Sequence, residues 1–214
     1  MDMINTGLFI SDEGLYDYAA STARLLRPTQ FAGGRSGAKL LRRHLGDIRR
    51  THEAVRRRYG SLPKPPAACE WLLDNYYMVQ REYAATCSAL SQAKRLRLCD
   101  EGLLILCLCR SLVESGQGRV TEERCKRFLD GFQSVTVLRR SELDLFPAAL
   151  RAAVIAEIAS VCRKLPFAAE TETHAAALEA LFGTLRLFSV LDTEKLLRGA
   201  ECVRILQGGP HHSA

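Results

Sequence analysis

The chain has 214 residues, of which 47% are hydrophobic and 25% are charged. This balance is ordinary for a globular protein and argues against wholesale disorder. No apolar run approaches the length of about 18 residues that a membrane-spanning helix needs, so none is expected. The net charge of +6 comes from one segment, because residues 35–58 hold nine lysines and arginines against two acids.

The periodicity of the apolar residues is helical along the whole chain and predicts an all-α bundle of about seven to eight helices. Serine, threonine or aspartate stands before several of these helices as an expected N-cap, namely Ser11, Asp100, Thr121, Ser141 and Asp192. The expected helices span about 12–26, 38–59, 67–93, 101–115, 122–133, 141–165, 170–189 and 192–206.

The same pattern divides the chain into three parts. Residues 1–37 are expected to form an N-terminal helix followed by a flexible linker, because residues 27–37 are rich in proline and glycine. Residues 38–206 are expected to form the helical domain, and residues 207–214 a disordered tail.

The eight cysteines include no CxxC pair. Cys107 and Cys109 lie two positions apart in a helical pattern and point to different faces, so they are poorly placed to share a metal. We therefore expect reduced, mostly buried thiols in a cytosolic protein. Phosphate-binding, nucleophile-elbow and zinc-protease motifs are also absent. The sequence thus predicts no catalytic residue, no cofactor and no metal site.

The helix expected over 38–59 has two contrasting sides. Arginines recur about every seven residues and gather on one of them: Arg42, Arg43, Arg49, Arg50, Arg56 and Arg57. The other side is apolar: Leu40, Leu41, Leu45, Ile48 and Val55. A solvated arginine face is the simplest interpretation. The alternative is a phosphate-rich partner, either anionic lipid or nucleic acid. The lack of interleaved aromatic residues disfavours nucleic acid.

The segment EWLLDNYYMVQRE, residues 70–82, places one tryptophan, two tyrosines and an Asp-Asn pair in an otherwise apolar run. Apolar positions with helical spacing predict a core-facing stripe: Leu72, Tyr76, Val79, Tyr83, Cys87 and Leu90. Trp71 and Met78 predict a second packing seam.

Asp74 and Asn75 fall beside these seams. We expect them to be buried polar tethers, with Arg81 or an arginine of the preceding helix as partner, because an unpartnered buried polar group destabilises by about 1–3 kcal/mol. A ligand site is the alternative interpretation.

Residues 70–82, and the Arg/Leu-rich helix before them, resemble the WLLDN-type region near the start of cyclic β-1,2-glucan synthases and their cellobiose-phosphorylase-like relatives. The resemblance extends over about 38–206, with Asp144 where the family has tryptophan. A second stretch matches at Phe128, Gln133, Leu138, Glu142, Leu143, Pro147, Leu150 and Arg151. The residues taken as the structural motif are Trp71, Asp74, Asn75, Tyr76, Glu142, Pro147 and Arg151.

The resemblance implies a bacterial family that makes β-1,2-glucan from UDP-glucose at the cytoplasmic membrane. This chain would be its non-catalytic N-terminal scaffold or docking region, located in the cytoplasm at the inner face of that membrane. The implied partners are other domains of the same polypeptide or a membrane-associated glucan synthase. The rival hypothesis is a stand-alone helical protein that binds an anionic surface, lipid or RNA, through its arginines.

Overall fold

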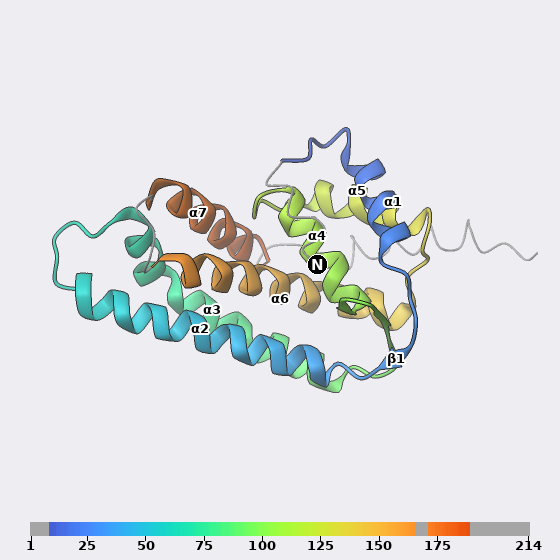
Figure 1. The fold of residues 1–214 in the computed structure, drawn as a ribbon, viewed down its shortest axis with the longest axis horizontal. Helices are drawn as coiled ribbons and strands as arrows, with labels where there is room; N and C mark the ends of the chain where they lie inside the picture. The colour runs from blue at the N-terminus through green and yellow to red at the C-terminus, as the bar shows by residue number, and fades with distance from the viewer. Residues whose placement is uncertain (1–8, 166–170, 189–214) are drawn as a thin grey trace, which may run out of the picture.

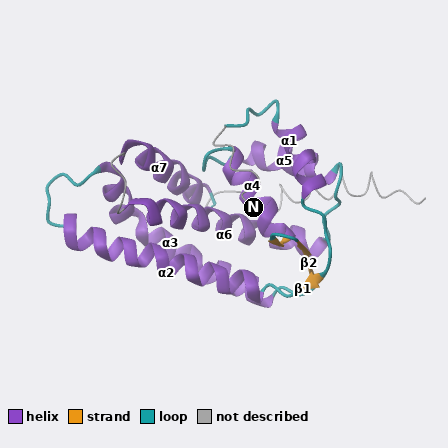
Figure 2. Ribbon diagram, viewed as in Figure 1, coloured by secondary structure: helices purple, strands orange, loops and turns teal. Residues whose placement is uncertain are grey.

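The computed structural model describes residues 9–165 and 171–188. The all-α prediction is confirmed, since these residues form seven helices and one small three-stranded sheet (Figures 1 and 2). The helices are α1 (Leu15–Leu25), α2 (Arg35–Tyr59), α3 (Ala67–Gln92), α4 (Leu104–Ser115), α5 (Glu122–Gln133), α6 (Arg140–Lys164) and α7 (Thr171–Leu187). The strands are β1 (Phe31–Ala32), β2 (Leu96–Cys99) and β3 (Gly102–Leu103).

Helix α6 lies at the centre of the bundle and contacts α2, α3, α4 and α7. Among the described helices it is the one long and apolar enough to cross a membrane by length and composition. However, 61% of its most apolar window is buried inside the molecule. It is therefore a core helix, and α2 and α3 pack on it.

Helix α1 forms a second layer with α5 (Figure 1). The two backbones approach closely at Gly131, where a Cβ atom would lie only 2.3 Å from the carbonyl oxygen of Tyr16. The segment before α1 is held by the buried side chain of Arg124. Its guanidinium pairs with Asp12 and donates a hydrogen bond of 3.1 Å to the carbonyl oxygen of Ile10.

The small sheet was not predicted. Strand β1 pairs with β2 in antiparallel register, with Phe31 opposite Arg97, and β2 pairs with β3. Residues 27–37, expected as a linker, therefore contain β1 and the first turn of α2. The prediction of a helix from residue 101 is also wrong. Residues 102–103 form β3, which makes a hairpin with β2, and α4 begins at Leu104.

Of the predicted N-caps within the described residues, one is confirmed and three are wrong. Thr121 is confirmed, because its Oγ1 accepts a hydrogen bond of 3.2 Å from the backbone N–H of Arg124. Ser11, Asp100 and Ser141 are wrong, since the residues at the N-cap positions are Gly14, Leu103 and Arg139. The start of α6 is instead capped by its own Glu142, whose carboxylate accepts a hydrogen bond of 2.9 Å from the backbone N–H of Arg139. Asp192, the helix expected over 192–206 and the tail 207–214 lie outside the described residues.

The prediction of free, mostly buried thiols is confirmed for the described part of the chain. Cys87 is half-buried and the other six are buried, namely Cys69, Cys99, Cys107, Cys109, Cys125 and Cys162.

Candidate anionic-surface site and adjoining pocket

Helix α2 runs along one long edge of the molecule (Figure 1). Its apolar face packs on α3 and α6, with Leu41, Ile48 and Val55 buried. Leu40 does not join them, contrary to the sequence prediction, and is 49% exposed.

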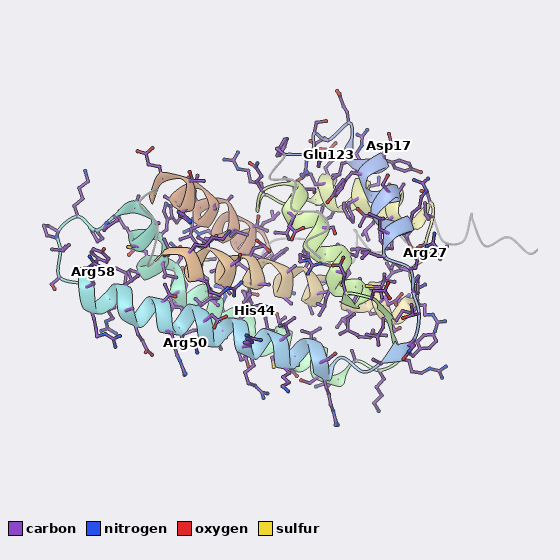
Figure 3. All side chains as sticks on the ribbon, viewed as in Figure 1. Asp17, Arg27, His44, Arg50, Arg58 and Glu123 are labelled. Atoms are coloured by element: carbon purple, nitrogen blue, oxygen red, sulfur yellow. The ribbon has the colours of Figure 1, made fainter. Side chains whose placement is uncertain are left out.

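The outward face of α2 is a long row of cations. Figure 3 shows side chains along the outer edge of α2 pointing away from the bundle, with Arg50 and Arg58 labelled. At 1.5 Å per residue, Arg35 and Arg57 lie about 33 Å apart along the helix axis. We call the following exposed residues the cation row: Arg35, Lys39, Arg42, Arg43, Arg49, Arg50, Arg56, Arg57 and Arg58.

Two residues of the cation row have acidic partners. Arg50 pairs with Asp47, which also accepts a 3.1 Å hydrogen bond from Arg163 of α6. Arg49 lies 4.0 Å from Glu53. Arg42 instead interacts with the Tyr83 hydroxyl of α3. Within the described residues, the other six cations have no acidic partner closer than 4.0 Å: Arg35, Lys39, Arg43, Arg56, Arg57 and Arg58.

All six arginines singled out in the sequence are exposed, so one helix brings them together as expected. Of these six, Arg43, Arg56 and Arg57 have no acidic partner among the described residues. The six arginines do not include three members of the cation row, Arg35, Lys39 and Arg58. Residues 27–37 were expected to form a linker, and the pattern that was singled out consists of arginine pairs seven residues apart. Extending the 3.6-residue period back to Arg35 would have found Arg35 and Lys39.

An open pocket adjoins the cation row at the point where α2 passes α3. It encloses about 490 Å³. His52 stacks on Tyr76 at its edge, with ring centroids 4.2 Å apart and planes inclined by 18°. Burial, and then the nearby charge of Arg56, lower the pKa of His52, so its imidazole is neutral at pH 7. The lining residues are His52, Arg56, Gly60, Pro65, Glu70, Leu73 and Asp74.

The two walls of the pocket have opposite charge. Arg56 of α2 stands on one wall, and Glu70 and Asp74 stand one turn apart on α3. All three side chains are exposed, and none has an ion pair within 4.0 Å among the described residues. The pocket therefore offers an anion site and a cation site side by side.

The adjacent residues Asp74 and Asn75 have different surroundings, because Asn75 is buried and Asp74 is exposed. Asn75 is buried, with 4% exposure, and is a tether as predicted. Its Nδ2 donates to the carbonyl oxygen of Trp71 at 2.9 Å, and its Oδ1 accepts from Arg186 of α7 at 2.6 Å. The tether prediction for Asp74 is wrong, because α3 turns this residue outward to the pocket.

The predicted partners of these residues are also wrong. Arg81 donates to Glu82 at 2.9 Å, and no arginine of α2 reaches Asn75. The partner Arg186 lies 111 residues further along the chain. Trp71 and Tyr76 are half-buried and pack against the core, as expected of packing residues. The ring of Trp71 lies 5.9 Å from the guanidinium of Arg186.

The second motif is built into the core. Glu142 is fully buried and pairs with Arg97 of β2, while Arg151 lies 3.1 Å from Glu82 of α3. Pro147 lies inside α6, which continues past it. These residues join different pairs of elements, so the motif does not converge on one catalytic site. Among the described residues, no group of three or more metal-ligating side chains is placed to hold an ion.

Comparison of the chain with protein-family models, with curated proteins and with solved structures finds no significant match. The fold and site therefore define a class only, which is an all-α bundle that presents a basic helix along one edge.

Proposed function

We propose that this chain is a non-catalytic helical docking module that binds an anionic lipid surface through the cation row of α2. One observation carries the proposal. Six exposed cations on a single straight helix have no acidic partner among the described residues. Four of them, Arg35, Lys39, Arg43 and Arg57, lie within about 80° of one another around the helix axis, because successive helical residues point about 100° apart. These four can meet one surface together.

The energetics favour such a surface. A basic residue close to an anionic membrane contributes about 1 kcal/mol, so the four residues on this side supply about 4 kcal/mol at moderate salt. Arginine guanidinium groups also form two parallel hydrogen bonds to a phosphate. Without a partner these charges repel one another along the helix, and a layer of phosphates relieves that repulsion.

Lipid is favoured over nucleic acid by the side chains between the cations. The exposed face of α2 from Arg35 to Arg58 has no aromatic residue on which bases could stack. Arg58 and Tyr59 form a cation–π contact at 5.2 Å, but Tyr59 is half-buried at the end of the helix.

The glucan-synthase relationship is a proposal about family, supported by the two sequence motifs and by the basic helix before the first of them. A docking role at the cytoplasmic membrane agrees with it. We expect the isolated chain to transfer no glucose from UDP-glucose and to phosphorolyse no β-1,2-glucan. Turnover in either assay would contradict the non-catalytic role.

Co-sedimentation with vesicles tests the lipid proposal. We expect binding to vesicles containing phosphatidylglycerol, weakening as salt rises, and little binding to pure phosphatidylcholine. Replacing Arg35, Lys39, Arg43 and Arg57 by glutamate should abolish it.

The matched control replaces four exposed cations on other elements, Arg24, Arg119, Lys126 and Arg127, by glutamate. Both variants change the net charge by 8, from +6 to −2. Equal loss in the two variants would show that net charge alone matters and would overturn the assignment to α2. Tighter binding to RNA than to vesicles would favour the rival partner.

A further inference from the structure

The pocket between α2 and α3 shares Arg56 with the cation row. The cation row can bind an anion alone. In the pocket, Glu70 and Asp74 add a site for a cation beside Arg56. The volume of about 490 Å³ lies within the range of about 300–1,000 Å³ typical of small-molecule sites. The pocket is thus a candidate for a ligand that carries both charges.

We infer that this pocket binds a phosphoethanolamine group, with its phosphate at Arg56 and its ammonium between Glu70 and Asp74. The inference rests on the proposed lipid-binding function and adds a preference for one headgroup. The neutral imidazole of His52 adds a hydrogen-bonding group that is not itself a second cation, so Arg56 provides the local positive charge.

The placement of the acids supports this assignment. Glu70 lies in the first turn of α3, where an acid is favoured by the helix dipole alone. Asp74 lies one turn further on, where that effect has faded. It also has no ion pair with a described cation. A primary ammonium has three N–H donors and can bridge the two carboxylates, which are neighbours at i and i+4.

Choline is the discriminating comparison, because its three methyl groups remove every N–H donor while keeping the positive charge. A site that depends on hydrogen bonds to Glu70 and Asp74 must prefer ethanolamine. A site that senses only charge must treat the two alike. Phosphate alone would use Arg56 and leave both acids unused.

The experiment titrates the full chain with soluble phosphoethanolamine, phosphocholine and inorganic phosphate, monitored by amide NMR. We expect phosphoethanolamine to shift the signals of Gly60, Leu73 and Asp74 and to bind about tenfold tighter than phosphocholine. In the double variant Glu70→Gln/Asp74→Asn, the ratio of the two affinities should fall to about one. Its circular dichroism spectrum should be unchanged. Equal binding of phosphoethanolamine and phosphocholine to the native chain would overturn the inference.

Vesicles separate this inference from the function on which it rests. At fixed phosphatidylglycerol content, replacing phosphatidylcholine by phosphatidylethanolamine should strengthen binding of the native chain to the vesicles. The vesicle binding of the double variant should not change. If both proteins bind anionic vesicles with no headgroup preference, the pocket assignment fails and the cation row stands. If neither binds anionic vesicles while soluble phosphoethanolamine still binds the pocket, the lipid function fails instead.

Discussion

The buried carboxylate of Glu142 joins the hairpin to the central helix through Arg97. The Nε of Arg97 donates to Oε1 at 2.9 Å, and the backbone N–H of Arg97 donates to the same oxygen at 3.2 Å. The backbone N–H of Arg139 donates to Oε2 at 2.9 Å. Glu142 therefore satisfies donors of Arg139, three residues before it, and of Arg97, 45 residues before it.

Replacing Glu142 by glutamine should lower the free energy of unfolding by about 3 kcal/mol at pH 7, because it leaves the Arg97 charge without its buried partner. Urea denaturation measures the loss. The control is Asp144→Asn two positions further on, where the pair with Arg140 is exposed and the change should stay within about 0.5 kcal/mol. Equal losses in the two variants would contradict the structural role of Glu142.

The same pair predicts a pH dependence. Burial raises the pKa of Glu142, but hydrogen bonds from Arg97 and Arg139 and the charge of Arg97 outweigh it, so the pKa lies below its ordinary value of 4.5. The stabilisation is then present above pH 4.5 and is lost as the pH falls through the lower, folded-state pKa. The difference between the native chain and Glu142→Gln should shrink over this acidic range and be constant between pH 6 and 8.

Glu114 should have the opposite dependence. Burial and the nearby charge of Glu157 raise its pKa to about 7, although Arg110 offsets part of the effect. Between pH 4.5 and about 7 the folded protein keeps a proton that the unfolded chain has released, so stability falls as the pH rises. Its side chain is 33% exposed.

Allowing for that exposure, Glu114→Gln should remove about 1 kcal/mol of the loss in unfolding free energy between pH 5 and pH 8. Denaturant titrations at the two pH values measure it. Glu123→Gln, at an exposed position of α5, serves as the control. An unchanged pH slope in Glu114→Gln would show that Glu114 does not carry this effect.

Asn75 and Asp74 should respond differently to alanine. Asn75→Ala removes the acceptor of Arg186 and the donor to Trp71, so we expect a loss of about 2 kcal/mol and a fall in Tm of about 6 °C. Asp74→Ala should change the unfolding free energy by no more than about 0.5 kcal/mol, because its side chain is exposed. Thermal denaturation compares them directly. A larger fall for Asp74→Ala would restore the role predicted from the sequence.

Gly131 tests the packing of α1 against α5, and Gly183 is its control. Gly131→Ala places a Cβ atom 2.3 Å from the carbonyl oxygen of Tyr16, so α1 must move away from α5. We expect a loss of about 2 kcal/mol. Gly183→Ala in α7 meets no atom within 4 Å and should stabilise by about 0.5–1 kcal/mol through helix propensity. Chemical denaturation of both variants provides the measurement.

Much of the helical architecture could be predicted from local pattern. The bounds of α5 agree with the expected 122–133, because Thr121 caps it and its apolar spacing is regular. The pairing of β1 with β2 could not be predicted in this way. Leu98 exchanges backbone hydrogen bonds with Thr29 and Gln30, almost seventy residues away, and no local signal reports such pairing.

The candidate sites follow the same division. The cation row could be predicted because all its members lie on one helix, whose period alone brings them together. The pocket could not, since its walls come from two helices that pack on each other and on α6.

The sequence by itself determined the helices, the free cysteines and the basic face, because each depends on residue type and on a repeat of 3.6 residues. Only the tertiary structure decided that Asn75 is buried while Asp74 faces the pocket. Successive residues of a helix point about 100° apart, so which one is covered depends on where the neighbouring helix lies. Here α7 lies over Asn75 and brings Arg186 to it.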